Sequence, residues 1–473
     1  MLVHLFGSVS SPSCANFALK KTAEDNKENY DKSVINAVHK SFYLDDCLHS
    51  VATETEAIEL AADLQEILAK GGFCLTKWLS KSKRLLSSLP ESERTQSVKS
   101  LDFDEIESSE RALGVRWNFS EDTFSFDIIP KNKPTNRRGL LSIISSVYHP
   151  LGFVSPCILP AKAILQELCR RGLGWDDEIP ETERVKWTTW LTELPKMKQF
   201  SIPRSFKLPD EFGEIKMYEL HHFLDASIMG YGAVSYLRQI YATGKVHCSL
   251  VMAKSRLAPL KAMTIPRMEL SAAVLATRLD RMITQEIDLP LAKSTFWTDS
   301  TCVIRYIENQ DKRFQVFVAN RVSAILNQSD RSQWRCDTAQ KPADEASRGM
   351  TVKEFLSNER WSKGTAFLQQ PQDTWPQRPA SIGVVPPDDR ELKKESVAYA
   401  NETTEDDAVN QMFDKFSSWT RLRRVIAWTL RYKDNLLNQA KKRKFKEETK
   451  YSSDIEPLDS SRLQLSWLDA RRL

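Results

Sequence analysis

Two stretches, Met217-Tyr-Glu-Leu-His-His-Phe-Leu-Asp-Ala226 and Gly230-Tyr-Gly-Ala-Val-Ser-Tyr236, decide the fold that this sequence predicts. Both read as strands, and residues 246–253 form a third strand-like run. Residues 266–282 then show a helical period, with Leu270, Ala273, Val274 and Thr277 on one face. Residues 294–298 read as another strand, and a helix is expected after it. Strand, strand, strand, helix, strand, helix predicts an α/β (α+β) fold with a mixed sheet.

Four acidic residues occupy distinct places in this pattern: Asp225, Glu269, Asp299 and Asp344. Asp225 and Asp299 each follow an apolar strand, so their side chains can emerge at an edge of the sheet. Glu269 lies near the start of the amphipathic helix, which can pack on the sheet and turn the carboxylate inward. Asp344 lies in Pro342-Ala-Asp-Glu-Ala-Ser-Arg-Gly349, a helix start or a turn.

Carboxylates are hard oxygen ligands suited to Mg²⁺, and grouping them costs energy unless a cation neutralises them. Two such ions can activate a water and stabilise a leaving oxygen in phosphodiester cleavage. The plainer interpretation is that these are four of 63 acidic residues, solvated or capping helices. Their order and their strand and helix contexts favour one metal site.

Composition sets broad limits on the class of protein. The 473 residues suffice for two or three domains, and the net charge is only +4, so any basic surface must be local. The 8 cysteines are scattered without a CxxC pair, which argues against a zinc site or a disulfide framework and fits an intracellular compartment, cytoplasmic or nuclear. No apolar run is long enough to span a bilayer, and residues 1–6 make a poor signal peptide. No membrane partner is expected.

An acidic pair also lies upstream, in Tyr43-Leu-Asp-Asp46, where apolar arms on both sides predict a hairpin with the aspartates in its turn. A helix is expected next, from a capping box of Thr53 and Glu56 to Gly71-Gly72. Short strands are expected at residues 73–75, 113–117 and 124–128. Residues 139–200 read as mostly helical.

Over most of residues 1–430, the chain resembles the polyprotein of BEL/Pao long-terminal-repeat retrotransposons. The resemblance is carried by several motifs in the family's order, which are Val3-His-Leu-Phe-Gly7, Ser11-Pro-Ser-Cys-Ala-Asn-Phe17, Tyr43-Leu-Asp-Asp-Cys47, Gly71-Gly-Phe-Cys-Leu-Thr-Lys-Trp78, Arg138-Gly-Leu-Leu-Ser-Ile-Ile-Ser-Ser-Val-Tyr-His-Pro-Leu-Gly-Phe153, Phe223-Leu-Asp-Ala-Ser227, Pro266-Arg-Met-Glu-Leu270, Trp297-Thr-Asp-Ser300 and Pro342-Ala-Asp-Glu-Ala-Ser-Arg-Gly349.

This resemblance implies a ribonuclease H domain in which Asp225, Glu269, Asp299 and Asp344 ligate two Mg²⁺ ions and cleave RNA in an RNA–DNA hybrid. The chain departs from the pattern in two ways. Many such domains have a histidine shortly before the last aspartate, and this chain has none after His247. Lys341 also stands where the family pattern usually has Asn.

The resemblance further implies that residues 1–130 are part of a reverse-transcriptase palm. Asp45 and Asp46 would then be metal-site aspartates, Lys77 would lie near the phosphates of the nucleotide, and Phe124 and Phe126 would lie on the strands that hold the primer. A polymerase needs a third palm aspartate and a fingers domain, and no apolar strand before Tyr43 carries such an aspartate. This region is expected to be truncated and inactive by itself.

The rest of the predicted organisation follows the same resemblance. Residues 131–212 are expected to be a helical thumb or connection, and 213–352 the ribonuclease H-like domain. Prolines among Gln, Asp and Glu predict a linker over residues 353–406. Residues 407–473 resemble a truncated lead-in to integrase, and their basic run 441–446 is interpreted as a solvated helix end. The expected partners are an RNA–DNA hybrid or other nucleic acid, with an intact retroelement polymerase as a further candidate.

Two other functions remain open from the sequence. An aspartic peptidase is suggested by Asp299-Ser-Thr301 and by the word peptidase in one name of this family region, but the loop lacks the Gly that its tight turn needs. The other is a non-catalytic retroelement remnant that only binds nucleic acid. The presence of all four carboxylates argues against this second possibility.

Overall fold

The computed structural model of the chain describes most of the first 393 residues and a short helical stretch after them. The described residues are 9–43, 46–95, 109–112, 115–208, 213–336, 341–377, 382, 384–393, 418, 423–425 and 427–437. The chain forms two compact units, one that contains residues 1–392 and one made of residues 393–460. In the second unit, residues 423–425 and 427–437 are helical.

The centre of the first unit is a five-stranded mixed sheet in the order β11-β10-β7-β8-β9. Its strands are β7 (Ile215–Ala226), β8 (Gly230–Tyr241), β9 (Val246–Leu257), β10 (Thr295–Thr298) and β11 (Trp334–Cys336). The first three form an antiparallel meander, whereas β10 runs parallel to both β7 and β11. The strands expected from the sequence are confirmed, and so is the mixed α/β class.

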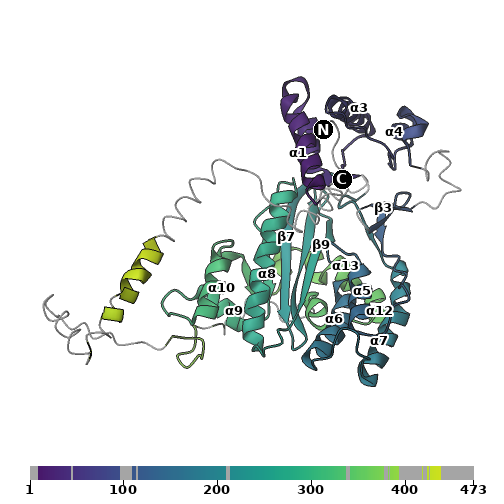
Figure 1. Cartoon of the computed structure of the whole chain (residues 1–473). Coiled ribbons are helices and arrows are strands. Elements are labelled where there is room, and N and C mark those ends of the chain that lie inside the picture. The colour runs from purple at the N-terminus through teal and green to yellow at the C-terminus, as the bar shows by residue number, and fades with distance from the viewer. Residues whose placement is uncertain are drawn as a thin grey trace. The chain divides into compact units, whose positions relative to one another are not determined.

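Helices cover both sides of this sheet (Figure 1). The long helix α8 (Ile265–Glu286) packs on β7 and β8, and α9 (Thr301–Glu308) and α10 (Val316–Leu326) pack beside it. On the other side, α6 (Ser155–Arg170) packs on β9, and the short α11 (Ala343–Arg348) packs on β7 and β8. Pro266 in the first turn of α8 suits a helix start because its missing N–H needs no partner there.

Residues 109–203 add a second, antiparallel sheet and three helices. The strands are β3 (Ser109–Ala112), β4 (Val115–Asn118), β5 (Thr123–Ser125) and β6 (Ser201–Pro203), in that order. The helices are α5 (Arg137–Ser146), α6 and α7 (Glu181–Glu193). The helical reading of residues 139–200 is confirmed, and these helices share one continuous core with the mixed sheet.

The N-terminal part is mainly helical, with its own small core. It comprises α1 (Ser11–Asp25), α2 (Lys32–Lys40), the hairpin of β1 (Phe42–Tyr43) and β2 (Asp46–Cys47), α3 (Glu54–Lys70) and α4 (Lys83–Ser88). The capping box of Thr53 and Glu56 is present, and Gly71 caps the end of α3. The strand expected at residues 73–75 does not form, because the backbone there pairs only through an isolated bridge at Trp78.

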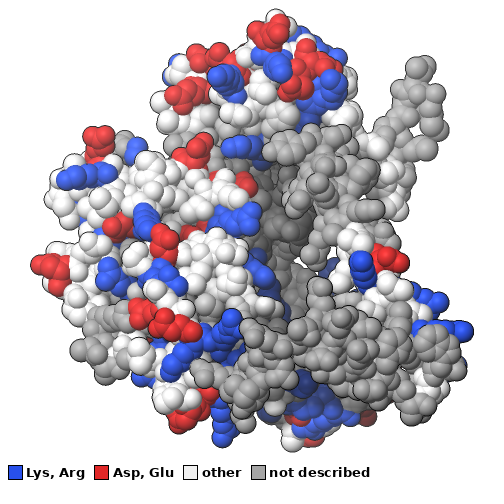
Figure 2. All heavy atoms as spheres, turned by 90° about the vertical axis from the view of Figure 1, so that its left-hand side faces the viewer, with Lys and Arg blue, Asp and Glu red and all other residues white. Residues whose placement is uncertain are grey.

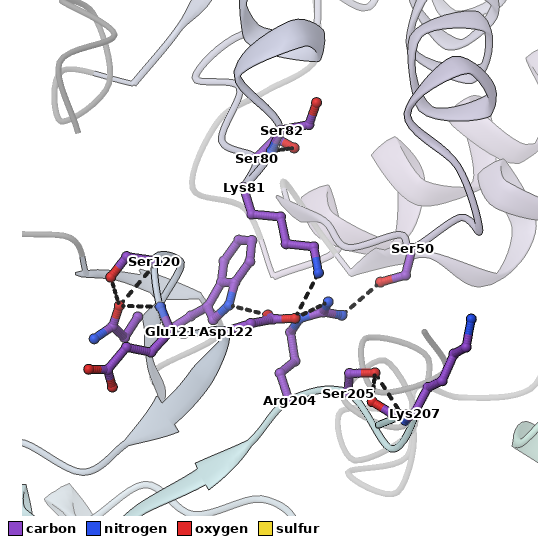
Figure 3. A network of polar contacts seen from close by, with 12 residues as sticks. Ser50, Ser80, Lys81, Ser82, Ser120, Glu121, Asp122, Arg204, Ser205 and Lys207 are labelled. Atoms are coloured by element: carbon purple, nitrogen blue, oxygen red, sulfur yellow. Dashed lines mark hydrogen bonds and ion pairs between the residues drawn. The ribbon is translucent and has the colours of Figure 1, made fainter. Parts of the chain in front are cut away.

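A polar network ties this N-terminal part to the second sheet (Figure 3). Asp122, in the β4–β5 turn, accepts hydrogen bonds from the Arg204 guanidinium at 2.5 and 2.8 Å. Lys81 donates to the same carboxylate at 3.1 Å, and Arg204 also donates to Ser50 at 3.0 Å. Trp117 donates its indole N–H to Asp122 at 3.1 Å. The network therefore joins four segments that are far apart in the sequence, around residues 50, 81, 117–122 and 204.

The described residues between 352 and 392 are packed, although their composition predicted a linker from residue 353. They form α12 (Val352–Leu356), α13 (Glu359–Lys363) and two short 3-10 turns. Large apolar side chains anchor them to the core: Phe355, Trp361, Leu368 and Trp375. The backbone carbonyls of Leu368 and Gln370 accept from the buried Arg238 of β8 at 2.6 and 3.0 Å. The linker prediction is wrong for these residues. Their buried apolar side chains are irregularly spaced, so the sequence shows no helical or strand period there.

On the face shown in Figure 2, Lys and Arg side chains are interspersed with Asp and Glu, as the small net charge of +4 leads one to expect. None of the helices that the structure describes has the length and the apolar character needed to cross a membrane.

Candidate active site

Two of the predicted carboxylates lie at one edge of the mixed sheet because their strands are parallel neighbours. Asp225 is the penultimate residue of β7, and Asp299 directly follows β10. In the β10–β7 register, Trp297 is opposite Phe223. Continuing that register by two residues puts Asp299 beside Asp225, since side chains two residues apart on a strand share a face.

Asp225 lies in a buried and polar environment. The residue is 3% exposed, and its Oδ2 accepts a hydrogen bond from the Ser347 hydroxyl at 2.5 Å. Burial raises the pKa of the Asp225 carboxyl above its usual value, and the nearby Asp344 and Asp299 carboxylates raise it further. Ser347 and the Lys341 ammonium act in the opposite direction. Asp225 therefore bears its charge at a cost that a cation would reduce.

Glu269 reaches the same cluster from the first turns of α8. Its Oε2 accepts a hydrogen bond from the Ser300 hydroxyl at 2.6 Å, and Ser300 also caps α9. Burial raises the pKa of Glu269, and the Asp299 and Asp225 carboxylates add to this effect. The helix thus turns this carboxylate toward the sheet edge, as its position in the sequence predicted.

Asp344 lies in α11, on the other side of the sheet from α8. Its Oδ2 is 3.5 Å from the guanidinium of Arg348. The second oxygen of Asp344, Oδ1, is buried and has no hydrogen-bond partner among the described residues, and the same holds for Oδ1 of Asp299. Buried carboxylate oxygens without partners are costly. Two of them within a cluster of four carboxylates fit a hard divalent cation such as Mg²⁺.

Lys341 is the one basic side chain that the structure records inside this cluster. It is 3% exposed, its ammonium forms an ion pair with Oδ2 of Asp299, and it lies 3.9 Å from Oδ1 of Asp225. In this arrangement, no three His, Cys, Asp or Glu side chains of the described residues are positioned as ligands of one ion. The carboxylate oxygens are suitable ligands for a cation, and the Lys341 ammonium lies among them.

The structure therefore brings together all four carboxylates that the sequence singled out, although their catalytic role stays a prediction. Three neighbours were missed as site residues: Ser300, Ser347 and Lys341. Each lies within three residues of a predicted aspartate, in Trp-Thr-Asp-Ser300 or in Lys341-Pro-Ala-Asp-Glu-Ala-Ser347. That proximity was the only signal available before the hydrogen bonds were seen.

The residues predicted for the palm do not form a comparable site. Asp45 lies outside the described residues, Asp46 is exposed on β2, and Lys77 is exposed with a left-handed φ of 59°. Phe124 and Phe126 are only 2% and 4% exposed, in the core beside α5 and α6. Their contact with nucleic acid stays a prediction, and their burial shows that alternation marks a buried face as readily as a binding face.

Comparisons with known proteins agree with this architecture. Residues 136–300 match the family described as "Pao retrotransposon-like RNaseH-like domain", a range that includes Asp225, Glu269 and Asp299. The resemblance to Pao-type retroelements inferred from the sequence is thereby confirmed for residues 136–300, which are similar to an RNase H-like domain of that kind. No curated protein is similar enough to count as a relative.

The solved structures that the chain matches include two foamy virus proteins. The foamy viral protease-reverse transcriptase dRH in complex with ds DNA is 14% identical with a TM-score of 0.41, and the match covers 70% of this chain and 49% of that one. The foamy viral protease-reverse transcriptase in complex with dsDNA is 13% identical with a TM-score of 0.18, with 71% and 60% covered. The chain thus spans about half of the first and three-fifths of the second.

Proposed function

We propose that the RNase H-like domain cleaves the RNA strand of RNA–DNA hybrids in a Mg²⁺-dependent reaction. The observation that carries the proposal is the cluster of four carboxylates at one sheet edge, with unpartnered buried oxygens on Asp299 and Asp344. A purely structural cluster would have its buried oxygens satisfied by donors, since almost all buried polar atoms in folded proteins are.

Each residue of the cluster has a proposed part in the reaction. Asp225, Glu269, Asp299 and Asp344 would hold divalent cations, which supply an activated water and a stabilised leaving oxygen when bound. Ser347 and Ser300 fix the orientation of Asp225 and Glu269 through their hydrogen bonds. Burial raises the pKa values of these two carboxyls, so cation binding and their ionisation favour one another.

The proposed substrate is supported by a local gathering of arginines on α8 and α10. Arg267 and Arg321 lie over the same Phe317 ring, 4.9 and 3.4 Å from its centroid, and Arg267 also pairs with Glu391. Burial lowers the pKa of Arg321, and the charges of Arg267 and Arg278 lower it further. Arg267 is two residues before Glu269 in the sequence. Guanidiniums bind phosphates well, so this group would position a nucleic-acid backbone near the carboxylates.

An aspartic peptidase is not supported by the site. Such an enzyme needs two carboxyl groups that share one proton. The Oδ2 atom of Asp299 is instead paired with the Lys341 ammonium, and four carboxylates gather where a peptidase would have two. We keep the non-catalytic reading, nucleic-acid binding alone, as the outcome that the following experiment can establish.

The test is cleavage of a labelled RNA–DNA hybrid by the full chain with Mg²⁺, beside the Asp299→Asn variant. The variant keeps the size of the side chain but loses its charge. We expect it to cleave about 100-fold more slowly or worse, because carboxylate–metal contacts contribute several kcal/mol to such reactions. Chelation of Mg²⁺ should stop cleavage by the native chain.

The matched control is Asp176→Asn, which removes an aspartate whose side chain is 66% exposed and paired with Arg138. It should cleave like the native chain. A folded native chain that binds the hybrid without cutting it would overturn the proposal and establish the non-catalytic reading. Equal cleavage by Asp299→Asn would show that a different site or a contaminant is responsible.

A further inference from the structure

Lys341 places a positive charge among the clustered carboxylates, whose negative charges need a cation nearby. Burial raises the pKa values of Asp225 and Glu269, and the neighbouring carboxylates raise them further. The Lys341 ammonium pairs with Asp299 and lies 3.9 Å from Asp225. Because Lys341 is only 3% exposed, water cannot solvate its ammonium group. A buried charge is tolerated only when it is paired.

The surroundings of Lys341 offer it no other role in the described structure. Its two ion-pair partners are Asp225 and Asp299, both members of the cluster. These two carboxylates come from neighbouring parallel strands and are held on rigid elements. The ammonium thus bridges the two carboxylates that are best positioned to share a divalent cation.

We propose that Lys341 is a built-in counter-ion that occupies the place of a divalent cation between Asp225 and Asp299, so that the ammonium must leave before a divalent ion can bind both. The inference rests on the proposed function only in taking these carboxylates as metal ligands. With Lys341 in place, Asp299 turns one oxygen to the ammonium and leaves the other without a partner.

Competition between the ammonium and a divalent ion has two measurable consequences. Removing the positive charge should strengthen binding of a divalent ion, because the ion no longer displaces or repels an ammonium. The same change should destabilise the metal-free protein, because Asp225 and Asp299 then lose the ammonium that pairs with them, whereas Asp344 keeps Arg348. An ordinary structural ion pair would give the second effect without the first.

The experiment measures Mn²⁺ binding by calorimetry and melting temperature with and without a chelator, in the full chain. Lys341→Asn and Lys341→Gln should each bind Mn²⁺ at least about tenfold more tightly, since a unit charge about 4 Å away in a partly buried site repels by several times the thermal energy. Both should melt at a lower temperature with chelator and gain more from added Mn²⁺ than the native chain. Lys341→Arg, which keeps the charge, should bind Mn²⁺ as weakly as the native chain.

The control is Lys293→Asn, which removes an exposed lysine paired with Asp330 and should leave Mn²⁺ affinity unchanged. Unchanged or weaker Mn²⁺ binding in both neutral variants, with their folds intact by circular dichroism, would overturn the inference. So would tighter binding in Lys341→Arg. Because affinity and melting are read without substrate, a chain that cuts no hybrid can still support the inference, and a cutting chain can still contradict it.

Discussion

His222 has two hydrogen-bonding partners, Ser235 and Asp280, of the kinds that a catalytic histidine has. Its Nδ1 is 2.8 Å from the Ser235 hydroxyl, and its Nε2 is 3.0 Å from Asp280. His222 and Ser235 are fully buried, and the imidazole stacks on Phe296. A substrate cannot reach a group without solvent access, so this Ser–His–Asp series is structural. Reactive side chains form a functional site only where a substrate can reach them, as it can at the partly exposed Asp299.

Asp122 shows what a single paired carboxylate contributes to stability, and its effect depends on pH. Burial alone would raise the pKa of Asp122, but the hydrogen bonds and charges of Arg204 and Lys81 outweigh it and lower the pKa below its usual value. A lowered folded-state pKa adds stability that is fully present above the unfolded-state pKa of about 3.9 and is lost as pH falls through the folded-state value.

We therefore predict that Asp122→Asn lowers the free energy of unfolding by about 3 kcal/mol at pH 7, because it breaks a mostly buried ion pair. Asn is suitable since it tolerates the left-handed φ of 53° at this position. The difference from the native chain should shrink below about pH 4, as Asp122 becomes protonated. Urea unfolding between pH 3 and pH 7 measures both effects.

The control for this prediction is Asp176→Asn, in the exposed pair of Arg138 and Asp176. Solvent screens such a pair, so little change in stability is expected at any pH. A difference between Asp122→Asn and the native chain that stays constant down to pH 3 would show that shape, and not charge, is what the residue supplies.

At the scale of elements, periodic patterns made the mixed sheet predictable. Helix α8 repeats apolar residues at the helical period, whereas β7 and β8 are strand-like runs in which consecutive residues are buried along most of the strand. The folded stretch 352–392 has no such period. Its anchors Phe355, Trp361, Leu368 and Trp375 stand at irregular intervals among prolines, so only the tertiary contacts distinguish it from a linker.

Trp375 is the anchor whose removal best tests whether this stretch is part of the fold. It is 7% exposed, and its ring contacts His221, Trp297 and Phe367, with centroids 5.2, 5.7 and 6.1 Å away. Arg238 lies over the ring at 5.0 Å. We predict that Trp375→Ala lowers the free energy of unfolding by about 3 kcal/mol, as large-to-small changes in a core do.

The matched substitution is Trp428→Ala in the second unit, where the side chain is 68% exposed. It should change stability by less than about 0.5 kcal/mol. Denaturant unfolding of both variants gives the comparison. Equal stability of the two variants would mean that residues 366–375 detach from the sheet in solution and that the linker interpretation was right after all.

At the scale of the whole molecule, the candidate site is assembled from the ends of β7 and β10 and from α8 and α11. Its four carboxylates are spread over the sequence from residue 225 to residue 344. Each carboxylate could be predicted because a recognisable stretch of sequence surrounds it. Their convergence follows from the parallel pairing of β7 with β10. The position of Lys341 could not be predicted, because nothing in the sequence says whether a lysine three residues before Asp344 points into the cluster or into solvent.

The two acidic regions of the molecule differ in how far their carboxylates gather, and this predicts different activities. Asp46 is exposed on a two-residue strand, and no third carboxylate or histidine completes a metal-ligand group with it in the described parts of the chain. The rings of Phe124 and Phe126 are buried, so they offer no surface to a primer. We therefore propose that the palm-like region does not polymerise DNA by itself.

The expected result is that the full chain does not extend a primer on an RNA template with Mg²⁺ and deoxynucleotides, under conditions in which the same preparation is assayed for hybrid cleavage. Polymerase chemistry depends on carboxylates that hold metal ions on nucleotide phosphates, and within the described residues the hairpin supplies only the exposed Asp46. Extension that disappears in Asp46→Asn would contradict the prediction and would mean that the hairpin joins further carboxylates when nucleic acid binds. Extension that survives in Asp46→Asn would point to a contaminating polymerase, because the charge proposed to matter would then be dispensable.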